Sequence, residues 1–289
     1  MAYIFHTSLK PIRVEALVEA HDWVLPRDHY FPGESHDFWE LVFVVEGFVA
    51  QTADERVYHL SQGNLVFIKP LAFHRMWIER NSPTRVILLS FRASGEWMRQ
   101  FEDSCFALNP AQQKHIKKLM DSHEKALVLA ETTDRQGYRI AVERTVVEAE
   151  SFLLQLLEKE EVTPALPQGA EAQYTKIICV MKEHCHEALN LEELAEKCYM
   201  SVSNMKRIFR RFSDVGVAKY YLFIRMRRAK ELLDEGLPAC DVAHQLGFDK
   251  VSYFHMVFKR EVGMTPNQYK LARVGTLRKE ENGIEKLQR

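Results

Sequence analysis

The distribution of apolar residues changes along the chain. Up to about residue 105, valine, phenylalanine, tryptophan and leucine come in short runs separated by turn-forming residues, a pattern typical of β-strands. Because short strands at near-regular spacing usually pack as a small barrel or a sandwich, we expect one of these at the N-terminus. The clearest predicted strands are Phe38–Glu46, Leu65–Lys69, Met76–Glu79 and Arg85–Phe91.

From Pro110 the apolar spacing becomes helical. Gln112–Ala130 and Arg135–Glu160 are charged segments with apolar stripes and few helix-breaking residues, which predicts two helices. An antiparallel pair attached to the N-terminal domain is the simplest packing, and the stripe could cover that domain. The following residues 162–170 hold two prolines and one glycine, which indicates a linker between domains.

The last part of the chain predicts the same helical unit twice. In the first copy, Ser201 is the expected N-cap of a helix over Val202–Phe212. In the second, Asp249 is the expected N-cap of a helix that Gly263 ends. The copies lie about 48 residues apart and are joined by a predicted helix over Lys219–Gly236. We therefore expect a duplicated helix-turn-helix.

Each of these second helices combines an apolar face with a polar face. Gly247 can adopt the positive φ that stops the first helix of the second copy, predicted over Pro238–Leu246. The apolar face of the later helix is predicted from Tyr253, Phe254, Val257, Phe258 and Val262.

Length and composition are those of two globular domains. The chain has 289 residues, 46% of them apolar, and no apolar run long enough to cross a bilayer. Its first residues lack the features of a signal peptide.

Five scattered cysteines fit a reducing cytoplasm better than a disulfide framework or a thiolate zinc site. The short run His184-Cys185-His186 is interpreted as a solvated helix end rather than a metal-binding clip.

Charge is spread unevenly over a chain whose net charge is −1. Residues 171–289 hold 21 Lys and Arg against 16 Asp and Glu, whereas residues 1–170 hold 18 against 24. A basic C-terminal part on a near-neutral chain indicates a polyanionic partner for that part alone.

The predicted strands carry two histidines and a carboxylate that can converge. Strand alternation places one set of residues on one face of a strand, and His74 and Met76 on a face of another. The first set is His36, Phe38, Glu40, Val42 and Val44. If these faces meet inside the domain, the three groups lie in an apolar interior. Burying them there is costly unless they bind a ligand, a metal ion or one another.

The stretch Gly247–Lys270 reads GFDKVSYFHMVFKREVGMTPNQYK. Its GF, SYF, FK, G, TP and Y resemble the signature of the AraC/XylS transcription regulators, with about ten positions agreeing at fixed spacing. The resemblance implies that the second helix of each motif enters the major groove of DNA, so that one chain reads an asymmetric site.

The resemblance also implies residue roles on the two helices. The family often has Arg where this chain has Met256, so the first motif is expected to discriminate more strongly among bases. The expected base-facing residues are Ser203, Lys206 and Arg207 in the first motif and Val251, Ser252, His255 and Met256 in the second. The expected phosphate contacts are Arg210, Arg211, Lys259 and Arg260.

Two sets of residues in the N-terminal part resemble the motifs of the cupin barrel: His36, Glu40 and Gly47, then Gly63, Pro70 and His74. Many AraC/XylS regulators carry such a barrel as their effector-sensing domain. This chain departs from metal-binding cupins at Glu34, where they have a histidine, and at Ala72, where they commonly have glycine. The loop HDFWE (His36–Glu40) is similar to that of sugar-utilisation regulators, which implies a sugar or sugar derivative as effector.

The resemblance assigns a set of residues to the effector. They are Glu34, His36, Phe38, Trp39, Glu40, His74 and Met76. His36, Glu40 and His74 are also candidate ligands of a divalent metal, namely zinc, iron or nickel. The alternative is that they bind the effector, or one another, through hydrogen bonds.

We therefore predict an α+β protein with a cupin-like β-barrel and appended helices, followed by an all-α domain with two helix-turn-helix motifs. The expected segments are the barrel 1–105, a helical dimerisation segment 106–161, the linker 162–170, the DNA-binding domain 171–273 and a flexible tail 274–289. The predicted function is a cytoplasmic, effector-controlled transcription regulator without catalytic residues, more often an activator than a repressor. Its expected partners are double-stranded DNA, a second copy of the chain and RNA polymerase, but no membrane. The alternative is a metal-dependent cupin dioxygenase or isomerase fused to a DNA-binding module.

Overall fold

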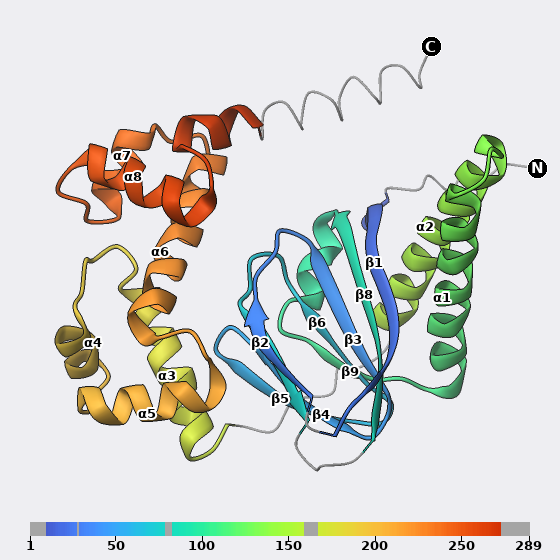
Figure 1. The fold of residues 1–289 in the computed structure, drawn as a ribbon, viewed down its shortest axis with the longest axis horizontal. Helices are drawn as coiled ribbons and strands as arrows, with labels where there is room; N and C mark the ends of the chain where they lie inside the picture. Colours follow the sequence, from blue (N-terminus) through green and yellow to red (C-terminus); the bar gives the residue numbers. More distant parts are fainter. Residues whose placement is uncertain (1–9, 28, 79–82, 159–166, 273–289) are drawn as a thin grey trace, which may run out of the picture. The chain divides into compact units, whose positions relative to one another are not determined.

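A computed structural model of the chain describes residues 10–27, 29–78, 83–158 and 167–272. The chain divides into two compact units, one ending at Pro167 and the other beginning at Gln168. The first unit is rich in strands and the second is helical (Figure 1), which confirms the predicted α+β class. Residues 162–166 of the predicted linker and the predicted tail 274–289 lie outside the described residues. Within the described part, none of the helices is both long and apolar enough for a bilayer crossing.

The N-terminal unit contains two antiparallel sheets, with strand orders β1-β8-β3-β6-β9 and β2-β7-β4-β5. The five-stranded sheet consists of β1 (Arg13–Leu25), β8 (Thr84–Ser94), β3 (Trp39–Glu46), β6 (Asn64–Ile68) and β9 (Cys105–Ala107). The four-stranded sheet consists of β2 (Tyr30–Glu34), β7 (His74–Ile78), β4 (Phe48–Ala53) and β5 (Arg56–Ser61).

An apolar layer joins the two sheets face to face. Val42 and Val44 of β3 lie in one buried cluster with Tyr58 and Leu60 of β5 and Met76 of β7. Side-chain packing, rather than backbone pairing, therefore holds the inner faces together.

The strands do not form the closed barrel that we expected. Among the described residues the backbone pairing stops at two separate sheets. β5 and β6 follow each other in the chain but belong to different sheets, and Gly63 with φ 88° lies in the turn between them. The arrangement is a two-sheet sandwich with the strand content of a cupin-like domain.

Helices α1 (Pro110–Ala130) and α2 (Arg135–Leu157) lie side by side against the outer face of the five-stranded sheet (Figure 1). Ile116 of α1 and Phe152 of α2 join Leu41 and Phe43 of β3 in a second buried cluster, together with residues of the short helix η1 (Glu96–Phe101). One apolar stripe of the helix pair thus covers the sheet, which is the packing that the sequence allowed.

The C-terminal unit repeats one helical motif. Its helices are α3 (Ala170–Glu183), α4 (Leu191–Lys197), α5 (Val202–Phe212), α6 (Val217–Asp234), α7 (Ala239–Gln245) and α8 (Val251–Val262). The pairs α4–α5 and α7–α8 are the two helix-turn-helix motifs. α6 has 18 residues, which makes it about 27 Å long.

Local sequence signals explain most of the helix ends. Asn190 and Glu193 form a capping box at the start of α4, and Ser201 accepts a hydrogen bond from the backbone of Asn204 at the start of α5. Two expectations about α8 are wrong. Lys250 rather than Asp249 precedes its first turn, without a side-chain cap. Tyr253 is 53% exposed, because the buried face of α8 consists of Phe254, Val257 and Phe258.

The loop after α3 and the second motif meet at Gly247. Gly247 has φ +66°, and a Cβ there would lie 2.6 Å from the carbonyl oxygen of His186. Glycine is required here twice over, because the left-handed conformation and the close backbone approach both exclude a side chain. We call this contact and its neighbours on α6 the inter-motif joint.

Two residues of α6 complete the inter-motif joint. Tyr221 donates its hydroxyl to the carbonyl oxygens of His184 and Glu187. Arg225 is buried, donates to the carbonyl oxygen of Leu246 and stacks over the ring of Phe248 at 4.4 Å. α6 therefore holds the end of α3 next to the turn between α7 and α8.

The glycines Gly247 and Gly263 allow a matched test of the joint. Both have positive φ, but a Cβ at Gly263 would meet no atom within 4 Å. We expect Gly263→Ala to cost about 1–2 kcal/mol from backbone strain alone, and Gly247→Ala to cost clearly more because of the clash with His186. Urea unfolding followed by circular dichroism measures the difference.

Tryptophan fluorescence supplies the control, since all four tryptophans lie before residue 105. Its transition should stay unchanged in both variants. Equal losses of stability for the two variants would contradict the close approach at the joint.

Candidate functional site

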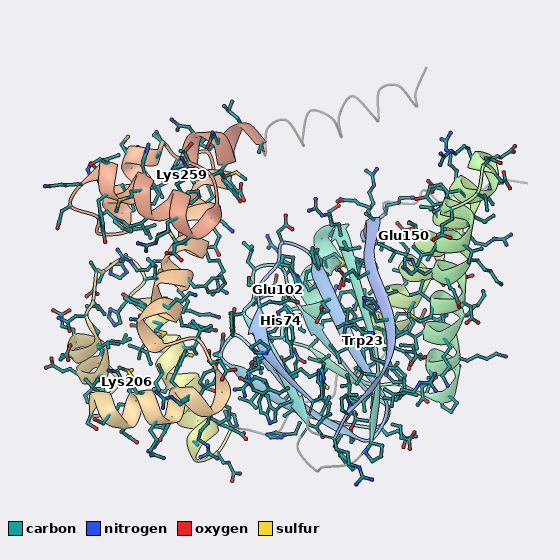
Figure 2. The ribbon with its side chains drawn as sticks, viewed as in Figure 1. Trp23, His74, Glu102, Glu150, Lys206 and Lys259 are labelled. Atoms are coloured by element: carbon teal, nitrogen blue, oxygen red, sulfur yellow. The ribbon has the colours of Figure 1, made fainter. Side chains whose placement is uncertain are left out.

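The expected cluster of histidines and carboxylates forms at the edge of the inter-sheet layer. Glu34 ends β2 and pairs in register with His74, which begins β7. Glu40 lies on β3 in the opposite sheet, on the same face as Val42 and Val44. Figure 2 labels His74 among the strands of this unit. We call Glu34, His36, Glu40 and His74 the inter-sheet cluster.

His36 reaches the cluster from a loop rather than from a strand. β3 begins only at Trp39, so the expectation that His36 and Phe38 continue its alternation is wrong. The loop nevertheless places His36 Nε2 3.5 Å from Glu40 Oε2. The ring of Phe38 stacks on that of His36 with 3.8 Å between centroids, which fixes the orientation of the imidazole.

The Glu40 carboxylate lies between the two imidazoles. His74 Nε2 is 3.6 Å from Glu40 Oε1 and 3.9 Å from Glu34 Oε1. Candidate ligand atoms of all four residues lie within 4.8 Å of one another. Glu40 is 4% exposed and His74 2%, whereas the side chain of Glu34 is 53% exposed. The cluster thus has a buried base and an open rim.

Backbone contacts orient both imidazoles. His36 Nδ1 lies 3.0 Å from the carbonyl oxygen of Phe38, and His74 Nδ1 lies 3.1 Å from that of Ala72. Because a carbonyl oxygen only accepts, each Nδ1 must carry the hydrogen. The Nε2 atom of each neutral ring therefore presents its lone pair to the cluster. His36 Nε2 is buried without a well-aligned hydrogen-bond partner.

The cluster also changes the protonation of His36. Burial alone would lower the pKa of His36, but the Glu40 carboxylate and the Phe38 carbonyl outweigh burial and raise the pKa above its ordinary value. A proton on His36 Nε2 and a divalent cation in the cluster would each neutralise the Glu40 carboxylate, so the two would compete for this position.

The donor set fits a divalent cation. Two imidazole nitrogens with fixed hydrogens on their far sides and one or two carboxylates are ligands suited to zinc, iron or nickel. His36 Nε2 is buried without a well-aligned hydrogen bond, and a ligand at this position would explain that arrangement.

Of the other residues expected to contact the effector, Met76 lies near the inter-sheet cluster and Trp39 does not. Met76 points into the inter-sheet layer on the same strand as His74. Trp39 belongs to the cluster of buried residues on the helix-covered side of the sheet, so the structure does not bring it to the inter-sheet cluster. Ser90 of β8 was not expected, yet its hydroxyl donates to Glu40 at 3.4 Å. The signal in the sequence is a lone hydroxyl within the apolar run of β8.

The first recognition helix, α5, separates its two faces sharply. Its buried face is Met205, Ile208, Phe209 and Phe212. The residues expected at DNA are all exposed on the other face: Ser203, Lys206, Arg207, Arg210 and Arg211. Arg207 Nη2 donates to Asn204 Oδ1 at 2.6 Å, so Asn204 orients the guanidinium, a role that the sequence did not reveal.

The second recognition helix, α8, offers a weaker set of donors. Ser252, Met256, Lys259 and Arg260 are exposed, while Val251 and His255 are half-buried. Arg260 Nε donates to Glu261 at 2.6 Å, which reduces its availability for a phosphate. Lys206 on α5 and Lys259 on α8 are labelled in Figure 2.

Comparison with known protein families matches both units. A family model described as "AraC-like ligand binding domain" matches residues 15–144, and one described as "Helix-turn-helix domain" matches residues 194–272. The chain belongs to the AraC family of transcription regulators. This AraC-family regulator therefore binds DNA through its C-terminal unit and carries a ligand-binding domain for a small-molecule effector.

Relatives of the regulator cover most of its length. The "uncharacterized HTH-type transcriptional regulator YpdC" of Escherichia coli K12 is 25% identical over 242 residues, which are 81% of this chain and 82% of that protein. The "HTH-type transcriptional activator RhaR" of Shigella dysenteriae is 22% identical over 85% of this chain and 88% of its own. The "HTH-type transcriptional activator RhaS" of an Enterobacter species is 23% identical over 86% and 90%.

The unequal donors of α5 and α8 lead to a prediction about base reading. We expect Arg207→Ala to reduce discrimination against single-base changes by about 1–3 kcal/mol, because the alanine variant could not form the bidentate contact to guanine that we expect of Arg207. His255→Ala should have a smaller effect. Binding of the full chain to a promoter fragment and its single-base variants measures both.

Arg207→Lys is the matched control. Lysine keeps the charge but not the planar pair of donors, so specificity should fall while the dependence of affinity on salt stays nearly constant. A larger loss of specificity in His255→Ala than in Arg207→Ala would overturn this ranking.

Proposed function

We propose that the N-terminal unit binds a sugar or sugar derivative at the inter-sheet cluster, and that this binding controls how the C-terminal unit acts at a promoter. The observation that carries the proposal is the burial of Glu40 between two imidazoles, one of which has an Nε2 without a well-aligned hydrogen bond. A buried carboxylate without a full set of donors is costly. An effector that supplies donors would offset this cost.

The chemistry of the cluster supports a polyhydroxylated effector. Glu40 and Glu34 accept hydrogen bonds, while an imidazole can donate or accept. Neighbouring hydroxyl groups of a sugar offer the complementary donors and acceptors. Phe38, beside His36, provides the flat apolar surface on which a sugar ring can rest. Phe38, Met76 and the four residues of the inter-sheet cluster are the proposed effector contacts; Trp39 is not among them.

A bound divalent cation is a second component of the proposal. His36, Glu40 and His74 would hold it, with Glu34 at the rim as a further donor. Such a cation supplies Lewis-acid attraction for an oxygen of the effector. The protein itself positions the ligand groups. The backbone carbonyl oxygens of Phe38 and Ala72 orient the two imidazoles, and the Ser90 hydroxyl donates a hydrogen bond to the Glu40 carboxylate.

The proposed output is activation of transcription in the cytoplasm, with RNA polymerase as the partner at the promoter. The relatives RhaR and RhaS are named activators, which supports this direction. The exposed faces of α5 and α8 provide the proposed DNA contacts, with Arg207 reading bases and Arg210 holding phosphate.

The rival function is a metal-dependent dioxygenase or isomerase fused to a DNA-binding unit. The convergence of four candidate ligand atoms favours it. Metal analysis of the purified protein separates the two. Stoichiometric iron together with oxygen uptake would support the enzyme, whereas stabilisation by a sugar without turnover supports the regulator.

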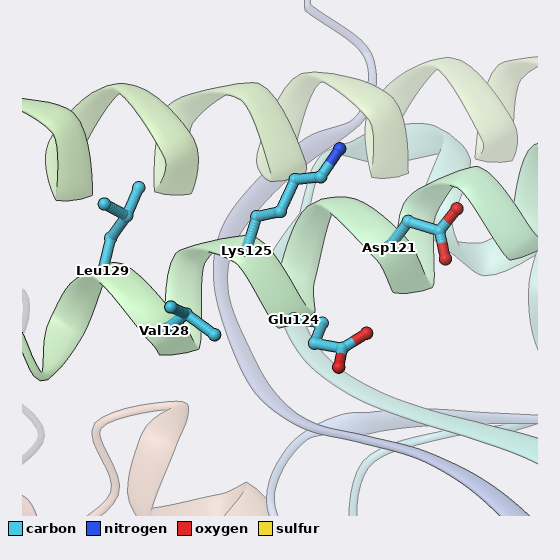
Figure 3. A pocket seen from close by; sticks show the side chains of 5 residues that line it. All are labelled: Asp121, Glu124, Lys125, Val128 and Leu129. Atoms are coloured by element: carbon cyan, nitrogen blue, oxygen red, sulfur yellow. The ribbon is translucent and has the colours of Figure 1, made fainter.

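The outer surface of the helix pair is the proposed contact between two copies of the regulator. Ile140, Val147 and Leu154 of α2 are exposed although apolar, and they recur every seven residues, the spacing of a helix seam. On α1, Val128 is 62% exposed beside a hollow lined by Asp121, Glu124, Lys125 and Leu129 (Figure 3). A second copy of the chain would cover these apolar groups.

The effector proposal predicts a stabilised protein. A thermal-shift screen of the full chain against mono- and disaccharides and divalent metals should identify a compound that raises the melting temperature. Glu40→Gln keeps the volume of the side chain but removes its charge, and should weaken that compound's binding about 10–100-fold. His21→Ala, at a half-buried histidine of β1 outside the inter-sheet cluster, is the control. A compound that stabilises Glu40→Gln as well as the unaltered chain would not bind at the cluster.

The homodimer proposal predicts a defect from one surface charge. Val147→Glu should raise the dimer dissociation constant at least about tenfold, because it places a charge in the apolar seam. Val24→Glu makes the same change at another exposed valine of the unit and should leave association unchanged. Sedimentation equilibrium measures both. Equal association of the two variants would exclude the seam as the dimer contact.

A further inference from the structure

A second cluster of metal-ligating side chains lies in the C-terminal unit. His184, His186 and Glu187 each offer a ligand atom, and these atoms lie within 4.8 Å of one another. His184 Nδ1 is 2.7 Å from Glu187 Oε1, and His186 Nε2 is 3.4 Å from the same oxygen. All three residues belong to the loop that follows α3, so a single short segment supplies the whole set.

We propose that His184, His186 and Glu187 bind a zinc ion, and that this ion stiffens the inter-motif joint of the DNA-binding unit. Two imidazoles and a carboxylate are a ligand set that zinc accepts, with water in the fourth position. The half-exposed His186 and Glu187 leave room for that water.

The distances already approach those of a zinc site. Zinc bonds to nitrogen and oxygen of about 2.0–2.1 Å place two tetrahedral ligands about 3.3 Å apart. The pair His186–Glu187 at 3.4 Å has this spacing, and the pair His184–Glu187 at 2.7 Å must open by a small side-chain rotation.

The two oxygens of Glu187 have different partners. Oε1 faces the histidines, whereas Oε2 lies 3.5 Å from Lys197 Nζ. Lys197 therefore orients the carboxylate from the side away from the imidazoles and does not occupy the ligand position. If these residues were only a solvated helix end, the contact between His184 and Glu187 would still be expected. The exposed His186 would have no reason to lie near the same oxygen, Glu187 Oε1.

The loop backbone is held in place before any ion binds. Tyr221 donates to the carbonyl oxygens of His184 and Glu187, and burial raises the pKa of Tyr221 to about 12, so its proton stays on. The backbone N–H of Glu187 donates to the carbonyl oxygen of His184 at 2.9 Å. Such preorganisation lowers the cost of assembling ligands around an ion.

The neighbouring Cys185 does not belong to the site. It is half-buried, and burial raises the pKa of its thiol, with Arg228 and Glu231 of α6 as its charged neighbours. Its sulfur is not among the ligand atoms that lie within 4.8 Å of one another.

The loop that would bind the ion contacts both α6 and the turn of the second motif. The carbonyl oxygen of His186 lies against Gly247, at the turn of the second motif, and Tyr221 connects the loop to α6. An ion bound here would therefore restrict the motion of the end of α3 against both α6 and the α7–α8 turn. The spacing of the two recognition helices depends on this joint.

Zinc titration of the full chain by calorimetry tests the site. The reference protein carries His36→Ala and His74→Ala, which remove the inter-sheet cluster, so any remaining zinc belongs to the C-terminal unit. We expect one zinc per chain at micromolar affinity, with affinity reduced at least tenfold in His186→Asn and in Glu187→Gln. Glu192→Gln, at an exposed carboxylate of α4, should bind as the reference does.

Thermal unfolding supplies the second readout. Zinc should raise the melting temperature of the helical unit in the reference protein and not in His186→Asn. If the reference protein does not fold, the same comparison is made in the unaltered chain, where His186→Asn should lower the zinc stoichiometry by one. Millimolar affinity, or zinc binding that both loop variants leave unchanged, would overturn the proposal. If the unaltered chain binds zinc and the reference protein does not, the metal belongs to the inter-sheet cluster instead.

Discussion

The N-terminal unit depends on the burial of one carboxylate. Glu40 projects from β3 between two sheets whose shared layer is otherwise apolar. Removing a charge from water costs several kcal/mol unless partners replace the water. His36, His74 and Ser90 provide partial replacement through long contacts, and each is held by its own strand or loop. The sheets thus place a polar cluster without a full set of hydrogen bonds at the edge of an otherwise apolar layer.

The C-terminal unit depends on a different constraint, the close approach of backbone at Gly247. Two recognition helices on one chain can read DNA together only if their spacing is fixed. α6 sets that spacing, and its residues Tyr221 and Arg225 attach to carbonyl oxygens on either side of the joint. The contacts are to backbone atoms, so they constrain the path of the chain rather than individual side chains.

Much of the site was predictable where the signal is local. Strand alternation placed Glu40 with Val42 and Val44, because successive residues of a strand point to opposite faces. Capping residues such as Asn190 and Ser201 act within one turn of the chain. Other assignments failed because they depend on distant neighbours. Trp39 joins the core beneath the helices, and Tyr253 is excluded from a core that three other residues of α8 already fill. The contact of Ser90 with Glu40 was missed for the same reason, because it joins two strands.

The sequence alone determined the kind of protein: a strand-rich unit, a helical unit with a duplicated motif, and the family to which that motif belongs. These properties follow from short-range periodicity, capping and spacing, which each segment carries by itself. Only the tertiary structure decided that the strands form two sheets instead of a closed barrel, and which polar groups converge. It also showed that His184, His186 and Glu187 share one carboxylate oxygen against the turn at Gly247. The strand pairing, the convergence at the inter-sheet cluster and the approach of His186 to Gly247 depend on packing between segments far apart in the chain, and no local pattern encodes them.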